Sequence, residues 1–243
     1  MKLTLLIPMY NESAVIEDTL REVSAYMKET FGDGYEILFV NDGSCDGCEA
    51  AVAAFPDPCV RLVSYPENRG KGYAIRTGVR EARGEVILFT DCDLAYGCEV
   101  IPEFYGILTG EGAPDIAVGS RAKHPEGYAG YTLLRKVVSR AYLSVLRLFG
   151  GLRLSDSQCG CKGFRAEVAK RIFSFCEVDR FAFDFEAILI GQRMGATFCE
   201  VPVKVLRHGE SKVRIVRDTL RMLRDLGRMK RRIGKLNFEE ETV

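Results

Sequence analysis

Apolar runs alternate with segments of helical period through the first half of the chain. The apolar, β-rich runs cover 3–7, 35–40, 60–64, 86–90 and 115–119. Between them, apolar residues recur at helical spacing at about 12–31, 46–54, 72–83 and 99–109. Continuous apolar strands joined in this way predict a parallel sheet covered on both faces. The first half is therefore expected to be a doubly wound α/β unit, with its ligand site beyond the carboxyl ends of the strands.

The alternation weakens after Ser120. A loop rich in Gly and Pro precedes an amphipathic helix near 132–149, a Gly/Cys loop, two further helices and a strand near 197–205. We interpret these pieces as an extension of the same domain, which then covers 1–212 in two parts, 1–120 and 121–212. The fold class predicted is α/β, with a doubly wound, mostly parallel sheet, helices on both faces and a C-terminal helical extension.

Charge is balanced overall but not locally. The 243 residues include 34 basic and 34 acidic side chains, so the chain has no overall attraction for nucleic acid. Residues 213–236, however, hold nine Lys or Arg and two Asp, and their apolar residues recur at helical spacing. This basic amphipathic helix, with an acidic tail to 243, would either lie on an anionic membrane surface or pack on the core through its apolar stripe.

The apolar runs are too short for a membrane span, and the N-terminus has no secretory pattern, which predicts a cytoplasmic protein, peripheral at the membrane face. Nine cysteines, an odd number, are typical of reduced thiols in a chain of this size. Two close pairs, Cys45/Cys48 and Cys159/Cys161, are weak zinc candidates because neither has a histidine nearby.

The strongest chemical signal is Asp91-Cys92-Asp93, directly after the apolar run 86–90. Side chains at i and i+2 point the same way on a strand, so both carboxylates would face one ligand. Two hard oxygen donors suit Mg²⁺ or Mn²⁺ together with a substrate diphosphate. The alternative is a surface turn with two solvated acids.

Other strand ends are expected at the same edge of the sheet. Asp42 follows the run 35–40, where its carboxylate would accept hydrogen bonds from a base or ribose, although Asn-Asp-Gly-Ser is also ordinary turn chemistry. Asn11 follows the first strand and would alternatively be the N-cap of the next helix. The basic loop 68–72 precedes a helix but has neither P-loop nor Gly-x-Gly-x-x-Gly spacing, which argues against a kinase or dehydrogenase.

Four motifs together resemble family 2 inverting glycosyltransferases, which have the GT-A fold. They are P-x-Y-N-E (8–12), N-D-G-S-x-D (41–46), N-R-G-K-G-x-A (68–74) and D-x-D (91–93). Further segments resemble the dolichyl/polyprenyl-phosphate sugar synthases, and closest the β-glucosyltransferase branch: Gly119-Ser120-Arg121, D-S-Q-C-G-C-K (156–162), R-F-A-F-D-F-E (180–186), E-V-P-V (200–203) and H-G-E-S-K (208–212). The resemblance runs from Leu3 to about Lys212, with 1–120 as the nucleotide-sugar half and 121–212 as the acceptor half.

The resemblance implies roles for individual residues. Asp91 and Asp93 would hold the metal and diphosphate and, with Asp184 as the candidate base, form the catalytic set. The implied donor site consists of Pro8, Tyr10, Glu12, Asp42, Lys71, Asp91, Cys92, Asp93, Arg121 and Lys212. The implied acceptor-phosphate site consists of Arg121, Arg135 and Ser139, the last two one helical turn apart. Arg135 would alternatively be a snorkelling surface arginine.

The implied reaction is inverting transfer of a hexose, expected to be glucose from UDP-glucose, to a polyprenyl or dolichyl phosphate, with Mg²⁺ or Mn²⁺. The alternatives are a GDP-mannose-dependent mannosyltransferase, a family 2 enzyme that extends a cell-surface glycan, and a non-catalytic nucleotide-sugar-binding protein. Two features depart from the family pattern. Cys161 stands where an aromatic residue is usual, and the membrane-spanning segments of many relatives are missing from this sequence.

Overall fold

The computed structural model describes residues 1–131, 139, 143–148, 151–207 and 226–238. Its strands are β1 (Leu3–Met9), β2 (Tyr35–Asp42), β3 (Val60–Tyr65), β4 (Val86–Phe89), β5 (Ile116–Ser120), β6 (Lys162–Arg165) and β7 (Phe198–Pro202). Its helices are α1 (Ile16–Phe31), α2 (Cys48–Ala53), α3 (Lys71–Glu81), α4 (Val100–Thr109), α6 (Ala166–Ser174) and α7 (Phe183–Arg193). Residues 143–148 and 226–233 are also helical.

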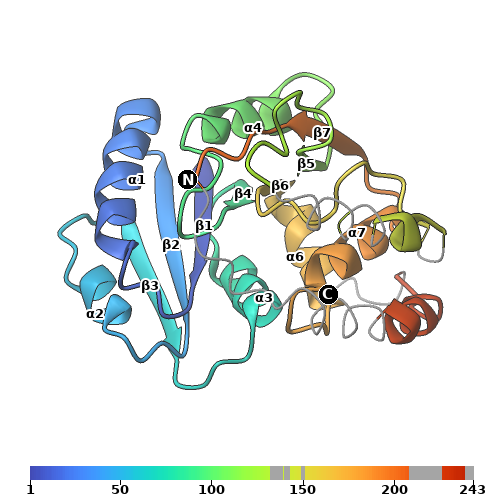
Figure 1. Cartoon of the computed structure of the whole chain (residues 1–243), viewed down its shortest axis with the longest axis horizontal. Coiled ribbons are helices and arrows are strands. Elements are labelled where there is room, and N and C mark those ends of the chain that lie inside the picture. Colours follow the sequence, from blue (N-terminus) through green and yellow to red (C-terminus); the bar gives the residue numbers. More distant parts are fainter. Residues whose placement is uncertain (132–138, 140–142, 149–150, 208–225, 239–243) are drawn as a thin grey trace.

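The described strands form one sheet in the order β3-β2-β1-β4-β6-β5-β7 (Figure 1). Strands β1 to β4 run parallel to one another, and β5 runs parallel to β7. Strand β6 is antiparallel to both of its neighbours, β4 and β5. The mostly parallel, doubly wound sheet expected from the sequence is thereby confirmed.

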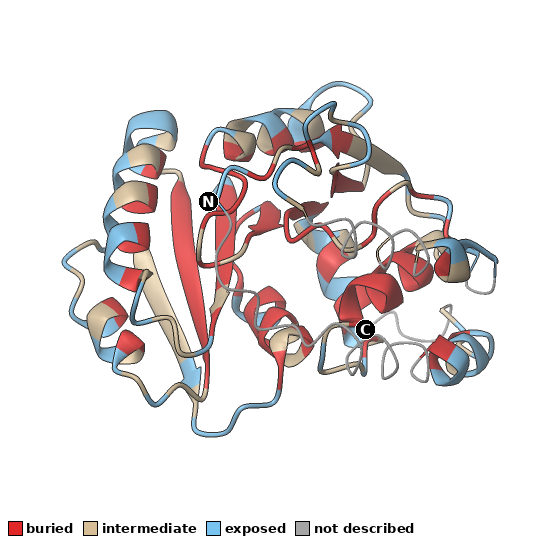
Figure 2. Cartoon of the chain, in the orientation of Figure 1, coloured by how far each residue is buried: buried red, intermediate tan, exposed pale blue. Residues whose placement is uncertain are grey.

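Alternate residues of the central strands belong to two separate hydrophobic cores, one on each face of the sheet. Leu5 and Ile7 of β1 are buried with α1, α2 and α4, whereas Leu6 is buried with α3, α6 and α7. Both faces are covered, so β1 and β2 are buried along nearly their whole length (Figure 2). This two-sided burial is why these strands read as continuous apolar runs.

Strand β6 was not predicted, because the segment that follows the predicted helix near 132–149 was read as a Gly/Cys loop. The strand is only four residues long and has one large apolar side chain, Phe164. Gly163 has no space for a side chain, since a Cβ there would stand 2.6 Å from Leu108 of α4. A short antiparallel strand of this composition has no alternating pattern, so it is recognisable only from its neighbours.

One helix boundary also differs from expectation. Helix α1 begins at Ile16 after Val15, and Asn11, which was considered as its N-cap, lies further upstream in a left-handed conformation with φ 52°. The predicted helix near 132–149 lies mostly outside the described residues.

The described end of the basic helix packs on the core, where Leu226, Met229 and Ile233 are buried. In the part of the chain that the structure describes, no helix has the length and apolarity of a membrane span.

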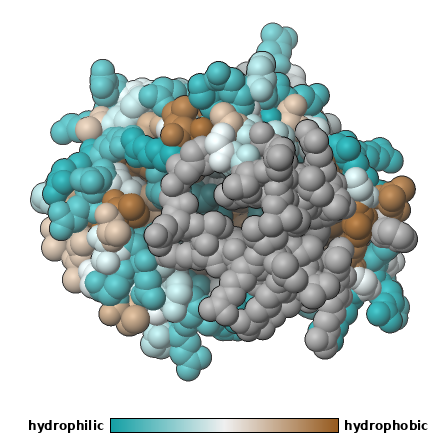
Figure 3. Space-filling model, viewed as in Figure 1, coloured by the Kyte–Doolittle hydropathy of each residue, from teal (hydrophilic) through white to brown (hydrophobic). Residues whose placement is uncertain are grey.

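The surface in Figure 3 is mainly hydrophilic, and its described apolar residues form small separate groups. Among the described residues, the exposed large apolar side chains are Met1, Tyr10, Leu148 and Leu206. Tyr10 lies directly after β1 and is the one of these four that belongs to the predicted donor site.

Candidate active site

Three neighbouring parallel strands end at the same edge of the sheet. Strand β1 ends at Met9, β2 at Asp42 and β4 at Phe89, and β1 pairs with both of the others. The loops that follow carry the motifs singled out in the sequence. Their convergence at the carboxyl edge is the usual location of a ligand site in a doubly wound sheet.

The loops after β1 and β2 are bonded into one unit. Asn11 donates its backbone N–H to Ser44 Oγ at 3.0 Å and accepts the Cys45 N–H at 2.9 Å through its side-chain carbonyl. The Ser13 N–H donates to Asp46 at 2.7 Å. Burial alone would raise the pKa of Asp46, but N–H donors from Ser13 and Cys48 outweigh it and hold that pKa well below its usual range. This edge is therefore held together by hydrogen bonds within the protein.

Asp42 organises the basic loop before α3. Its buried carboxylate accepts hydrogen bonds from the Asn68 amide at 2.9 Å and from the backbone N–H groups of Arg69 and Gly70 at 2.7 and 2.8 Å. The Arg69 guanidinium lies 3.7 Å from the ring centroid of Tyr73. Asp42 thus fixes the loop that brings Arg69 and the start of α3 to the sheet edge, and a direct contact with a nucleoside stays a prediction.

Asp91, Asp93 and Lys71 form the charged centre of the edge. Lys71, the first residue of α3, is ion-paired with Asp91. Burial alone would lower the pKa of Lys71, but the charges of Asp91, Asp184 and Asp93 outweigh it and raise that pKa. The pKa of Asp93 is also raised, first by burial and then by Asp91. A buried carboxylate whose pKa is raised by a neighbouring carboxylate lies in a region that is short of positive charge.

This donor set fits a hard divalent cation. Both carboxylates are oxygen donors of the kind Mg²⁺ and Mn²⁺ prefer, and Asp91 is partly exposed. Among the described residues no group of three or more His, Cys, Asp or Glu side chains is arranged to hold a metal. A cation held by Asp91 and Asp93 would therefore take its remaining ligands from substrate and water oxygens.

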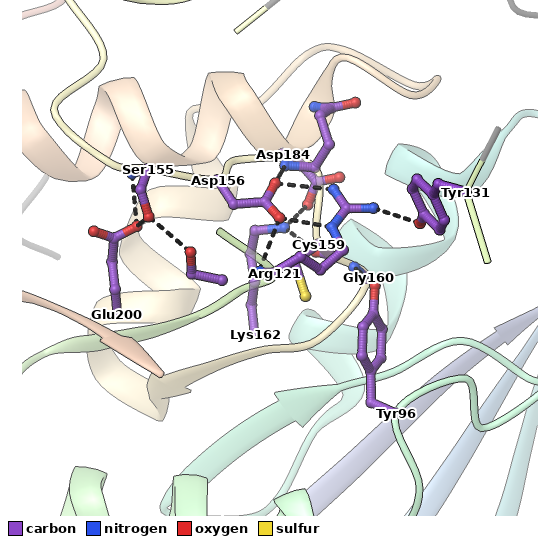
Figure 4. Close-up of polar contacts among 12 residues, drawn as sticks. Tyr96, Arg121, Tyr131, Ser155, Asp156, Cys159, Gly160, Lys162, Asp184 and Glu200 are labelled. Atoms are coloured by element: carbon purple, nitrogen blue, oxygen red, sulfur yellow. Dashed lines mark hydrogen bonds and ion pairs between the residues drawn. The ribbon is translucent and has the colours of Figure 1, made fainter. Parts of the chain in front are cut away.

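Asp184 lies in the first turn of α7 and is paired with Lys162 of β6 (Figure 4). Lys162 is 1% exposed and donates to Asp184 at 2.5 Å and to the Cys159 carbonyl at 2.6 Å. Burial raises the pKa of Asp184, and the positive charges of Lys162 and Lys71 oppose that rise. The candidate base is thus one half of a buried ion pair that sequence reasoning did not identify.

Arg121 is engaged by Asp156 in a bidentate pair (Figure 4). Its Nε donates to Asp156 at 2.7 Å and its Nη2 at 2.9 Å, while Nη1 donates to the Tyr131 hydroxyl at 2.9 Å. Burial alone would raise the pKa of Asp156, but the Arg121 guanidinium outweighs it and lowers that pKa. In this arrangement Arg121 holds the 155–158 loop, and the phosphate contact expected of it stays a prediction.

Gly160 is a site residue whose role the sequence did not reveal. An added Cβ there would stand 2.8 Å from Asp91 Cγ and closer still to Oδ2. Its N–H donates to the hydroxyl of buried Tyr96 at 3.1 Å. The D-S-Q-C-G-C-K segment was quoted only for its resemblance, and the structure places it as the wall behind Asp91.

The remaining predicted residues divide into described and undescribed positions. Pro8 is partly buried in β1, and Glu12 is partly buried in the following loop. Cys92 is buried, and its carbonyl accepts the Thr19 hydroxyl of α1 at 2.6 Å, which anchors the turn between the two acids. Ser139 is helical and partly buried. Arg135 and Lys212 lie outside the described residues.

The family model for glycosyl transferase family 2 matches residues 4–173, which include the four motifs at 8–12, 41–46, 68–74 and 91–93. The chain belongs to glycosyl transferase family 2. Among curated relatives, it is 37% identical over 226 residues to dolichyl-phosphate beta-glucosyltransferase ALG5C of Trichomonas vaginalis, covering 87% of this chain and 66% of that protein. It is 32% identical over 230 residues to the human dolichyl-phosphate beta-glucosyltransferase, covering 83% and 66%. The chain thus spans about two thirds of the length of these relatives.

Solved structures support the same fold. Glucosyl-3-phosphoglycerate synthase from Mycobacterium tuberculosis, in complex with UDP, superposes with a TM-score of 0.69 at 22% identity over 97% of this chain and 81% of that one. A complex of that enzyme with Mn²⁺, UDP and glucosyl-3-phosphoglycerate gives a TM-score of 0.68 at 20% identity, with the same coverage. The expected GT-A fold is confirmed.

Proposed function

We propose that this glycosyltransferase transfers glucose from UDP-glucose to a dolichyl or polyprenyl phosphate, with inversion and with bound Mg²⁺ or Mn²⁺, as a peripheral protein at the cytoplasmic face of a membrane. The observation that carries the proposal is the Asp91/Asp93 pair with Lys71 at the carboxyl edge of the sheet. The relatives named dolichyl-phosphate beta-glucosyltransferase support the sugar and the acceptor. The UDP and Mn²⁺ in the solved neighbours support the donor and the metal.

In this proposal the donor diphosphate lies between the sheet edge and the start of α3. Asp91 and Asp93 hold the metal, which supplies positive charge to the departing diphosphate. Lys71 contributes a further cation from the same side. An acceptor phosphate oxygen forms a bond to the anomeric carbon as the bond from that carbon to the UDP β-phosphate oxygen breaks, so that UDP leaves from the opposite face.

The Lys162–Asp184 pair fits an acceptor that is already ionised. A phosphate monoester, with a second pKa of about 6, is largely dianionic at neutral pH and needs no strong base. Oδ1 of Asp184 already accepts a hydrogen bond from buried Lys162, so that oxygen is not free to take a proton from an acceptor. A sugar hydroxyl acceptor would instead require proton removal during attack. We assign Asp184 to fixing the acceptor side of the site, with Arg135 and Ser139 contacting the acceptor phosphate.

The test uses labelled UDP-glucose or GDP-mannose, Mg²⁺ or Mn²⁺, and the purified protein with and without polyprenyl phosphate. Label that enters the organic phase only from UDP-glucose and only with lipid phosphate is the expected result. Label from GDP-mannose would identify the mannosyl enzyme instead. Donor binding without any transfer to lipid would refute the proposal and favour a glycan-extending or binding-only protein. The Asp91→Asn variant is the inactive control.

A further inference from the structure

The C-terminal segment, residues 226–238, packs against the helices that carry one wall of the site (Figure 1). Its helix buries Leu226, Met229 and Ile233 in the core shared by α3, α6 and α7. Phe238 makes an edge-to-face contact with Phe175 at a centroid distance of 5.1 Å. The segment is therefore part of the folded domain at this position.

Arg232 of this segment balances a fully buried carboxylate. Its Nη2 pairs with Glu186 of α7, which is 0% exposed, and its Nη1 donates to the Phe175 carbonyl at 2.8 Å. The second oxygen of Glu186 accepts the backbone N–H groups of Glu177 and Val178 at 3.0 and 2.8 Å. Because an unpartnered buried charge is strongly unfavourable, removal of Arg232 would release Glu186 from this position.

The backbone held by Glu186 packs against the turn that begins α3. The Asp179 carbonyl accepts the Tyr73 N–H at 3.1 Å. A Cβ at Gly70 would stand 2.5 Å from that carbonyl oxygen, and one at Gly72 would collide with the Val178 carbonyl. The two backbones are in direct contact, so the turn cannot keep its position if 177–179 moves.

We propose that Arg232 and Glu186 are positioning residues of the donor site, which hold 177–179 against the 70–72 turn and so keep Lys71 at Asp91. The inference rests on the proposed function in one respect, namely that Lys71 and Asp91 serve the metal and diphosphate. Neither Arg232 nor Glu186 has a described contact with Lys71 or Asp91. Their effect is on the affinity for the nucleotide, through the backbone.

The decisive comparison is between Arg232→Met and a matched control, Arg171→Met. Arg171 is exposed on α6 and donates to the Phe238 carbonyl at 2.7 Å, so its loss also loosens the segment but leaves Glu186 paired. Each variant is titrated with UDP in the presence of Mn²⁺ in a calorimeter, at a temperature below the melting temperatures of both. The affinity for UDP should be about tenfold weaker for R232M and unchanged within about twofold for R171M. Wild-type affinity in R232M, or equal weakening in R171M, would overturn the proposal.

Amide hydrogen exchange without nucleotide gives a second readout, which does not depend on the proposed function. In R232M the backbone amides of Glu177, Val178 and Tyr73 should exchange faster, while the amides of β1 should remain as protected as in the wild type. Unchanged exchange at Tyr73 would refute the backbone link. If the wild type fails to bind or transfer the nucleotide sugar, the proposed function fails, whatever the exchange experiment shows.

Rescue distinguishes the buried charge from general loosening. The double variant R232M with Glu186→Gln removes the uncompensated carboxylate and keeps a carbonyl oxygen for the two N–H donors, so it should recover much of the lost affinity and protection. If R232M does not fold, Arg232→Lys replaces it, because lysine keeps the charge but lacks the fork that reaches both Phe175 and Glu186. Absence of rescue by the double variant would contradict the role given to Glu186.

Discussion

The contact between Gly160 and Asp91 offers a direct test of the proposed metal site. Gly160→Ala would place a Cβ 2.8 Å from Asp91 Cγ, whereas ordinary contacts begin at 3.4 Å. The obstructing atoms belong to a side chain, and Gly160 has no positive φ, so the fold can accept the methyl group if the carboxylate turns aside. We expect a stability cost of about 1 kcal/mol, at the low end for overpacking.

The effect on activity should be much larger than the effect on stability. A displacement of about 1 Å in a catalytic group costs roughly 100-fold in rate. We therefore expect G160A to lose about 100-fold in kcat/KM for glucosyl transfer. The melting temperature should fall by only about 2–4 °C. Weaker Mn²⁺-dependent UDP binding, measured by calorimetry, should accompany the loss.

A matched glycine gives the control. Gly106 lies in α4, is exposed, and has no neighbour within 4 Å of an added Cβ. Gly106→Ala should therefore stabilise the protein by about 0.5–1 kcal/mol and leave transfer unchanged. If G160A kept wild-type kcat/KM and metal dependence, the Asp91 carboxylate would not be held in a functionally critical position, and the assignment of the site would be wrong.

Three further outcomes are expected. Asp93→Asn should abolish metal-dependent UDP binding yet raise the melting temperature at pH 7. Burial and Asp91 raise the pKa of Asp93 in the folded state, so the charged carboxylate destabilises the fold. This destabilisation is absent below the pKa of the unfolded state and grows until the pH exceeds the pKa of the folded state. Thermal unfolding of D93N and the wild type, in acid and at pH 7, should therefore show that the higher melting temperature of the variant disappears in acid. Lys162→Met should lower the free energy of unfolding, measured in urea, by about 3–5 kcal/mol, because it leaves Asp184 buried and unpaired. The double variant with Asp184→Asn should recover much of that stability. An equal loss in the single and double variants would exclude coupling between the two residues. Chelation with EDTA should reduce UDP affinity, and UDP should raise Mn²⁺ affinity by the same factor.

Strand ends were the part of the site most readily predicted from the sequence. The runs that became β1, β2 and β4 are continuously apolar because both faces of the sheet are covered, and Asp42, Asp91 and Asp93 follow them directly. Once the sheet is taken as parallel, their convergence follows from topology alone. Local pattern was sufficient to bring these carboxylates to one edge of the sheet, and their donor-binding roles stay a prediction.

Contacts between distant segments were beyond prediction. Arg121 pairs with Asp156, 35 residues away, and Glu186 with Arg232, 46 residues away. No spacing rule predicts, from a single sequence, which distant residues form such pairs. Arg121 was assigned to a phosphate because of the family resemblance; its pairing with Asp156 was not foreseen, and the phosphate contact stays a prediction. The burial of Lys162 could likewise not be predicted, because the short strand that carries it has no alternating pattern.

Charge balance links these contacts to ligand binding. The centre of the site brings three carboxylates, Asp91, Asp93 and Asp184, under the influence of two cations, Lys71 and Lys162. These five groups are therefore one positive charge short of neutrality. A diphosphate alone would add negative charge beside Asp93, whose pKa is already raised by burial and by Asp91. A divalent cation held by Asp91 and Asp93 would reverse the sign and make the site attractive to the diphosphate, whose oxygens would supply further ligands of the kind such a cation prefers. Metal and donor should consequently bind as a unit, which is the physical basis for expecting each to raise the affinity of the other.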